Sequence, residues 1–223
     1  MTHGFPHSTL VFFVALFTFG LSVTCSQANA DTTPPTILVM GDSLSAAYRL
    51  PEKKGWIALL QQRLREEYLP QRIVNASISG ETSSGGLSRL AAALDRHKPE
   101  IVIIELGAND GLRGLPLRLL RNNLQDMIKL AQHHRARVLL LGMRLPPNYG
   151  PAYTKGFAQI YENLARQYHI ALVPFLLEGV ATRAEMMQDD GLHPNALGQQ
   201  RIVDTVWPRL LPLLSAASAK RKP

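Results

Sequence analysis

Cysteine is almost absent from this chain, because Cys25 is the only one among 223 residues. Cys25 also falls within an N-terminal segment that we expect to be removed, which would leave a mature protein without thiols. Such a protein suits an oxidising compartment, and its composition excludes thiolate catalysis and cysteine-ligated metals. The sequence also lacks H-E-x-x-H or other metal-ligand spacing, and no G-x-G-x-x-G follows a strand-like run. We therefore expect neither a metal site nor a dinucleotide cofactor.

The sequence also lacks the features of a nucleic-acid-binding protein. Its formal net charge is +7, but no basic stripe with interleaved aromatic residues occurs, and part of the charge lies in Lys220 to Lys222. We interpret residues 216–223 as a basic, solvated C-terminal tail. At most, the positive charge would draw the protein weakly to anionic lipid headgroups.

The first thirty residues have the composition of an export signal. Residues 9–23, TLVFFVALFTFGLSV, are an apolar run, and Ala28-Asn29-Ala30 follows it as an A-x-A cleavage site. No Lys or Arg precedes the run, so an uncleaved membrane anchor is the alternative, although the run is short for a span. We interpret residues 1–30 as a signal peptide, cleaved near Ala30 to leave a periplasmic or secreted protein.

Residues 31–215 have the pattern of one α/β domain. The whole chain is 46% hydrophobic and 18% charged, as in globular proteins, and strand-like apolar runs alternate with amphipathic helical segments. The apolar runs are continuous, which is typical of parallel strands covered on both faces. Five repeats of this alternation predict a doubly wound parallel sheet of five strands. The expected strands are 37–40, 73–77, 101–106, 138–143 and 171–175, and the expected helices are 55–68, 85–97, 115–134, 157–169 and 195–214.

Polar residues follow the strands at the points where ligands bind in such sheets, beyond the carboxyl ends. The first strand ends at Gly41-Asp42-Ser43, the second leads into SISGETSSGG and the third into GANDG. The last junction contains DDGLHP. The candidates collected at this edge are Ser43, Gly80, Asn109, Asp189, Asp190 and His193.

This set contains the parts of a nucleophilic serine site. A serine hydroxyl is a poor nucleophile until a base takes its proton, and His193 can be that base if a carboxylate orients it. Asp190 lies three residues before His193, and Asp189 lies four before it. Acyl transfer also needs donors for a developing oxyanion. The backbone N–H groups of Ser43 and Gly80 and the side-chain amide of Asn109 are candidates.

Each of these residues also has an ordinary structural explanation. Ser43 is a common turn residue, Gly80 suits a turn with positive φ, and Asn109-Asp110-Gly111 is a plain turn signal. His193, which precedes a proline, can simply mark the start of a helix. Their placement on one rim favours catalysis, because a structural domain does not require the set.

Four sequence blocks resemble those of the GDSL, or SGNH, hydrolases. They are GDSLS (41–45), NASISGETS (75–83), ELGANDGLRG (105–114) and DGLHP (190–194). The match is closest to the multifunctional thioesterase I / protease I / lysophospholipase group, also described as arylesterases. LLLGMRLPPNYG and VPFLLEGV resemble this group as well, so the similarity covers nearly the whole mature chain.

The resemblance implies a catalytic triad of Ser43, Asp190 and His193, and an oxyanion hole of Ser43, Gly80 and Asn109. It favours Asp190 over Asp189 as the acid. It also implies a flavodoxin-like three-layer α/β/α fold without a metal or organic cofactor. Asp42 and Asp110 are expected to hold their loops through hydrogen bonds to backbone N–H groups.

Apolar residues near the rim point to an acyl substrate. Leu112, Leu145, Pro146 and Leu192 can sheath an acyl chain, although Leu192 can also simply cap the core. The family resemblance points to acyl thioesters, aryl and alkyl esters, and lysophospholipids. We expect a monomeric serine esterase that acts on such small molecules. The alternatives are a carbohydrate acetylesterase with the same triad and a non-catalytic exported module that binds lipid.

Overall fold

The computed structural model describes residues 1–4 and 34–219, and the side chains of residues 215–219 are not described. The chain divides into two units, Met1–Thr33 and Pro34–Pro223. In the first unit only residues 1–4 are described, and they form neither helix nor strand. The cleavage site expected near Ala30 and the basic residues at 220–222 lie outside the described residues. The signal-peptide interpretation therefore stays a prediction.

The second unit is built on a parallel sheet of five strands in the order β2-β1-β3-β4-β5. The sequence pattern predicted this number of strands and their parallel arrangement. The central strands β1 and β3 are buried throughout, which explains their continuous runs of Ile, Leu and Val. The strands are β1 (Thr36–Gly41), β2 (Arg72–Asn75), β3 (Ile101–Glu105), β4 (Arg137–Leu141) and β5 (Ala171–Val173).

Six α-helices connect and cover these strands in the described part of the chain. Each long helix buries one apolar stripe; in the first, for example, Trp56, Leu60 and Leu64 are fully buried. The helices are α1 (Trp56–Glu66), α2 (Ser83–His97), α3 (Ala108–Leu112), α4 (Leu117–His133), α5 (Pro151–Tyr168) and α6 (Ala196–Ala219). Short 3₁₀ turns occupy Glu52–Lys54, Pro147–Tyr149 and Ala184–Met186.

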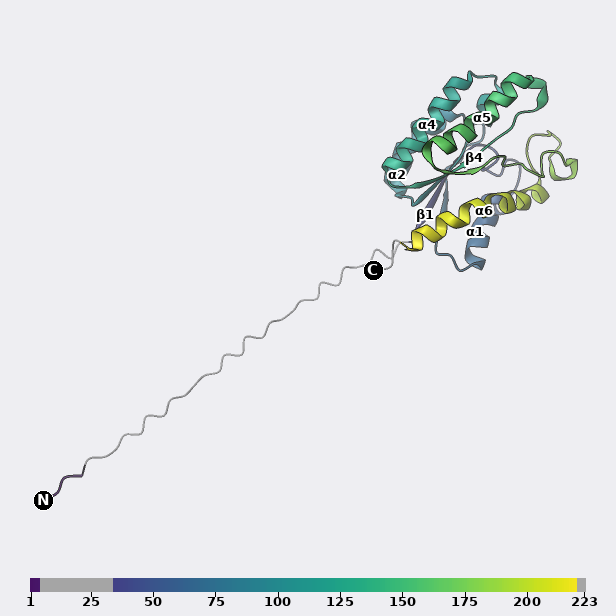
Figure 1. Cartoon of the computed structure of the whole chain (residues 1–223). Coiled ribbons are helices and arrows are strands. Elements are labelled where there is room, and N and C mark those ends of the chain that lie inside the picture. Colours follow the sequence, from purple (N-terminus) through teal and green to yellow (C-terminus); the bar gives the residue numbers. More distant parts are fainter. Residues whose placement is uncertain (5–33, 220–223) are drawn as a thin grey trace. The chain divides into compact units, whose positions relative to one another are not determined.

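The helices form a layer on each face of the sheet. Helices α2, α4 and α5 pack side by side on one face, and α1 and α6 pack together on the other (Figure 1). The result is the three-layer α/β/α arrangement that the sequence predicted. Strand order 2-1-3-4-5 is that of flavodoxin-like folds, whose ligands bind where the strand order reverses, between β1 and β3.

Three segments differ from the sequence-based expectation. No helix was expected at Asn109, where a plain turn was the structural alternative, but this residue lies in the short helix α3. Helix α5 begins at Pro151, six residues before the helix expected at 157–169. Proline is well tolerated at the first helical position, where its missing N–H has no partner to lose. Helix α6 continues to Ala219, beyond the end of the helix expected at 195–214.

None of the described helices is both long enough and apolar enough to cross a bilayer.

Candidate active site

Ser43 lies directly after the central strand β1, at the edge where β1 and its neighbour β3 end. The turn that carries it is tight. The N–H of Leu44 donates to Asp42 Oδ1 (3.0 Å), and the N–H of Ala46 donates to the carbonyl oxygen of Asp42 (3.0 Å). A side chain at Gly41 would not fit, because an added Cβ would lie 2.8 Å from Ser45 Cβ and from Glu105 Oε2. The turn thus holds Ser43 at the carboxyl edge of the sheet.

His193 and Asp190 reach Ser43 from the loop before α6. Nε2 of His193 lies 2.8 Å from Ser43 Oγ, and Nδ1 lies 2.8 Å from Asp190 Oδ2. An ionised carboxylate only accepts hydrogen bonds, so Nδ1 carries the proton and Nε2 is free to accept from the serine hydroxyl. The structure therefore brings together the three side chains expected to form a triad. The contact is made by Asp190 rather than by Asp189.

The Asp190 carboxylate is held in its ionised form. Burial alone would raise its pKa, but two backbone N–H groups and the imidazole of His193 outweigh that effect and lower the pKa to about 2. The two N–H donors, from Leu192 (2.9 Å) and His193 (3.0 Å), both reach Oδ1. Oδ2 is left for the imidazole. The backbone of the loop thus fixes the carboxylate independently of the imidazole that it contacts.

Two residues that the sequence analysis did not single out connect this loop to the serine turn. The Tyr48 ring packs against the His193 ring, with centroids 4.4 Å apart. The Gln188 side-chain amide donates to the carbonyl oxygens of Tyr48 (3.0 Å) and Pro194 (3.1 Å). The N–H of Gln188 also donates to the carbonyl oxygen of His193 (2.7 Å). No residue-type signal in the sequence marks the contact between Gln188 and Tyr48, since these residues are 140 positions apart in the chain.

The three expected oxyanion donors lie in different surroundings. Gly80 has a φ of +80°, which favours glycine at this turn. Within the described part of the chain, the N–H groups of Ser43 and Gly80 donate to no other residue. The amide nitrogen of Asn109 already donates to Asp42 Oδ2 (3.0 Å) and to the carbonyl oxygen of Glu81 (3.0 Å). Two donors are therefore unoccupied by protein, and the third is engaged.

Asp42 and Asp110 hold loops, as expected. Asp42 accepts from the Leu44 N–H within its own turn. Asp110 is buried and accepts from both the N–H (2.8 Å) and the hydroxyl (2.6 Å) of Ser83. Because Ser83 opens α2 and Asp110 lies in α3, this pair joins the Gly80 loop to the helix that carries Asn109.

The residues expected to bind substrate are spread over three segments near the rim. Leu112 is half-buried at the end of α3, and its carbonyl oxygen accepts from the Tyr149 hydroxyl (2.9 Å). Leu145 packs close to Gly111, and Pro146 beside it is exposed. Leu192, next to His193, is 44% exposed. The contacts join Leu112 and Leu145 to the α3 side of the site, whereas Leu192 lies on the histidine loop.

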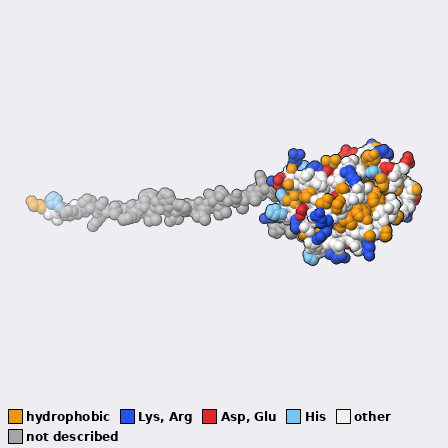
Figure 2. All heavy atoms as spheres, turned by 90° about the horizontal axis from the view of Figure 1, so that it is seen from above, with side chains coloured by type: hydrophobic (Ala, Val, Ile, Leu, Met, Phe, Trp, Pro, Cys, Tyr) orange, Lys and Arg blue, Asp and Glu red, His pale blue; other side chains and the backbone are white. Residues whose placement is uncertain are grey.

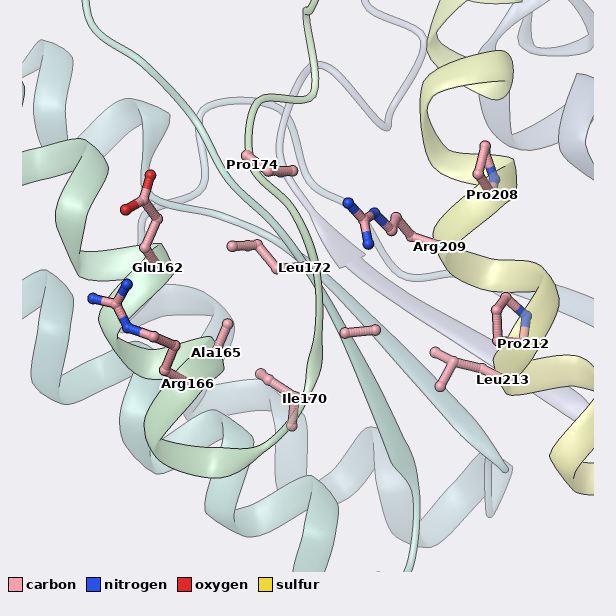
Figure 3. A pocket seen from close by; sticks show the side chains of 11 residues that line it. Glu162, Ala165, Arg166, Ile170, Leu172, Pro174, Pro208, Arg209, Pro212 and Leu213 are labelled. Carbon is pink, nitrogen blue, oxygen red and sulfur yellow. The ribbon is translucent and has the colours of Figure 1, made fainter.

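The larger of two described cavities lies away from these residues. It has a volume of about 490 Å³ and runs along the edge strand β5, between α5 and α6 (Figure 3). Arg166 on α5 and Arg209 on α6 line it from opposite sides (Figure 3). A smaller cavity of about 270 Å³ lies behind the serine turn, beside Ser45 and Asn75. Neither cavity includes Ser43 or His193, so neither locates an acyl pocket.

The positively charged side chains are dispersed on the face of the molecule drawn in Figure 2. Lys and Arg side chains are scattered among hydrophobic ones on the face drawn in Figure 2. On this face they form no continuous basic stripe. Among the described residues, no group of three or more His, Cys, Asp or Glu side chains is placed to hold a metal ion.

A parallel α/β sheet that carries a Ser–His–Asp arrangement at its carboxyl edge defines a serine hydrolase class. Comparison with known proteins narrows the class. The family model described as "GDSL-like Lipase/Acylhydrolase family" matches residues 39–201. The chain belongs to this family.

Individual relatives agree with this assignment. Esterase TesA of Pseudomonas aeruginosa is 54% identical over 179 residues, covering 80% of this chain and 89% of the relative. Thioesterase 1/protease 1/lysophospholipase L1 of Escherichia coli (strain K12) is 41% identical over 199 residues, covering 89% and 92%. The crystal structure of the psychrotrophic esterase EstA from Pseudoalteromonas sp., inhibited by monoethylphosphonate, matches with a TM-score of 0.77 at 42% identity. That match covers 81% of this chain and 98% of the other.

Proposed function

We propose that this acylhydrolase is a serine esterase in which Ser43 is the nucleophile, His193 the general base and Asp190 the residue that orients the base. Ser43 Oγ forms a bond to the acyl carbon while its proton passes to His193 Nε2. Collapse of the tetrahedral intermediate breaks the bond to the leaving group, which takes the proton from His193. Water, activated by the same histidine, then releases the acid and restores Ser43.

The observation that carries this proposal is the continuous contact from carboxylate to imidazole to hydroxyl, with 2.8 Å at each step. A base must lie within hydrogen-bond reach of the proton that it removes, and here it does so without substrate. Asp190 carries a negative charge at neutral pH because its pKa is lowered to about 2. That charge would stabilise the imidazolium formed when Ser43 loses its proton.

The oxyanion is proposed to bind the N–H groups of Ser43 and Gly80 together with the Asn109 amide. The two N–H groups need no rearrangement, since no described residue accepts from them. Asn109 would have to share or turn one of its two amide hydrogens, which face Asp42 and Glu81. An uncharged amide suits the role, because it does not attract the ground-state substrate as strongly as a cation would.

The proposed substrates are aryl esters, acyl thioesters and lysophospholipids with acyl chains that contact Leu112, Leu145, Pro146 and Leu192. The relatives' names support the ester and thioester classes. Removing methylene groups from water along these side chains would contribute about 0.8 kcal/mol each. We further propose that the protein acts as an exported monomer after cleavage near Ala30, at most weakly associated with membranes.

An acyl-length series tests the activity. Wild type should hydrolyse aryl esters, thioesters and lysophospholipid, and Ser43→Ala should lose this activity. Ser88→Ala is a matched control, since Ser88 is exposed on α2 and its hydroxyl donates only to the Gly85 carbonyl oxygen. Full esterase activity in Ser43→Ala would refute the proposal.

Two further results would favour the alternative functions. If the protein hydrolyses acetylated sugars faster than esters of longer acyl chains, a carbohydrate acetylesterase is favoured. A fluorophosphonate that fails to label Ser43 would favour a non-catalytic lipid-binding module.

A further inference from the structure

A second acidic side chain lies beneath the serine turn and has no part in the mechanism above. Glu105, at the carboxyl end of β3, is fully buried, and Asp42 beside it is fully buried as well. The salt bridges of the described residues include none to either carboxyl group. Two adjacent carboxylates without a cation are costly in a dry interior, so one of them is expected to keep its proton.

The hydrogen bonds indicate which one is ionised. Asp42 receives donors on both oxygens, from the Leu44 N–H (3.0 Å) and the Asn109 amide (3.0 Å). Glu105 receives both of its donors on one oxygen, Oε2, from the Asp42 N–H (3.2 Å) and the Ser45 hydroxyl (2.8 Å). Its other oxygen, Oε1, is buried and accepts from no described residue. An oxygen without a donor suits the protonated side of a carboxylic acid.

The charges around the pair agree with this assignment. Burial raises the pKa of Glu105 well above its usual value, and the nearby charge of Asp42 raises it further. Burial also raises the pKa of Asp42, to about 6, although the Leu44 N–H, Glu105, His193 and Asn109 oppose the rise. Tyr161 from α5 and Asp110 from α3 are the other titratable groups nearby. Neither supplies a positive charge.

We propose that Glu105 is a neutral acid beside the Asp42 carboxylate, and that this pair positions both the nucleophile and the oxyanion donor. Glu105 Oε2 accepts from the Asp42 N–H and from the Ser45 hydroxyl, which lie one residue before Ser43 and two residues after it. Asp42 in turn binds Asn109. These hydrogen bonds link the serine turn to α3, and one proton on Glu105 leaves a single negative charge near His193. Glu105 is a positioning residue, and its effect on turnover rests on the proposed function.

Three variants separate a neutral Glu105 from an ionised one. Glu105→Gln is the neutral isostere, which keeps an acceptor for the Asp42 N–H and the Ser45 hydroxyl. Glu105→Ala removes all of these bonds. Glu67→Gln is the control for loss of a carboxylate, because Glu67 is exposed at the end of α1. Thermal unfolding, infrared spectra and steady-state kinetics are measured for all three and for wild type.

The stability and infrared measurements do not depend on activity. An acid whose folded pKa is raised destabilises the fold above its unfolded pKa of about 4.3, and this cost vanishes at lower pH. Glu105→Gln should therefore unfold at a higher temperature than wild type near neutral pH, and this difference should disappear as the pH falls toward about 4.

Near neutral pH the infrared band of a protonated carboxyl group should be present in wild type and Glu67→Gln and absent in Glu105→Gln. A lower unfolding temperature for Glu105→Gln at neutral pH, or a band that survives the substitution, would overturn the assignment.

Kinetics test the positioning role. Glu105→Gln should keep kcat within a few-fold of wild type, with the acid limb of its pH–rate profile unmoved. Glu105→Ala should lose about 100-fold in kcat with little change in KM, as expected when reacting groups are displaced by about 1 Å. Wild-type kcat in Glu105→Ala, or an acid limb displaced in Glu105→Gln, would overturn the proposal. If wild type itself does not react with a fluorophosphonate, the proposed function fails while the infrared and unfolding results still decide the charge of Glu105.

Discussion

The aromatic ring of Tyr48 packs against the imidazole of His193, with ring centroids 4.4 Å apart and planes inclined by 38°. Tyr48 lies in the turn that begins with the nucleophile, and the guanidinium of Arg49 lies over its ring, 5.1 Å from the centroid. The imidazole is thus confined by Asp190 at one nitrogen, by Ser43 at the other and by Tyr48 against its face. We infer that this contact helps to orient the imidazole of His193.

Replacement of Tyr48 should slow catalysis only when the ring is lost. Tyr48→Phe keeps the packing and should have nearly wild-type kcat. Tyr48→Leu should lower kcat about two- to tenfold, since aromatic pairs contribute about 0.5–1.5 kcal/mol beyond their buried area. Initial rates on an aryl ester measure the difference. Equal rates for the Leu and Phe variants would show that the ring does not orient His193.

Removal of the Gln188 amide should loosen the connection between the two loops. Gln188→Ala leaves the carbonyl oxygens of Tyr48 and Pro194 without this donor, and Gln188→Glu places a carboxylate against them. The alanine variant should lose about 1–3 kcal/mol of unfolding free energy, and the glutamate variant should lose more. Urea denaturation gives both values. Gln167→Ala, at an exposed position of α5, is the control. A glutamate variant as stable as wild type would contradict the bridging role.

Neutralising Asp190 should inactivate the enzyme without unfolding it. Asp190→Asn leaves Nδ1 without its charged acceptor and allows the wrong tautomer, so kcat should fall by about 10⁴. Asp189→Asn should keep wild-type activity, because the contact to His193 comes from Asp190. Single-turnover rates on an activated ester compare the two variants. Comparable losses of activity in both variants would show that the acid role cannot be assigned to Asp190 alone.

Loss of the Asn109 amide should change both rate and pH dependence. Asn109→Ala should lower kcat by about 10²–10³, the cost typical of one missing oxyanion donor. The substitution also removes a donor to Asp42, so the pKa of Asp42 should rise above its present value of about 6. Ionised Asp42 accepts from Asn109 and places a negative charge near His193, so we expect its protonation to slow catalysis and the acid limb of the profile to move to higher pH. The pH dependence of kcat on an aryl ester measures this shift, with Asn163→Ala on the exposed face of α5 as the control. An acid limb at the same pH as in wild type would show that the ionisation of Asp42 does not control catalysis.

Much of the fold could be predicted because its signals are local. Continuous apolar runs such as 101–106 mark strands that are buried on both faces, and alternation with helical patterns implies a parallel sheet. The errors occurred where local signals are ambiguous. The stretch around Asn109 has the composition of a turn and forms a short helix, and Pro151 starts a helix within an apparent loop.

The candidate site was predicted less completely. Ser43, Asp190 and His193 could be selected because the edge of the sheet and the four sequence blocks both indicate them. Tyr48 and Gln188 were missed, since a ring contact and an amide bridge leave no mark on the sequence. Glu105 had a faint signal, because it is the only charged residue in the apolar run 101–106. A charge in a buried strand requires a partner or a proton.

Periodicity and strand-end motifs were sufficient to place a serine, a histidine and an aspartate at one edge of a parallel sheet, since each residue's hydrophobicity shows whether it is suited to burial. They could not establish that the imidazole meets a hydroxyl 150 positions away, or that two acids lie together beneath that hydroxyl. Those contacts depend on how separate loops pack at the ends of β1 and β3, where distances of a few ångströms and the exclusion of water control which groups carry charge.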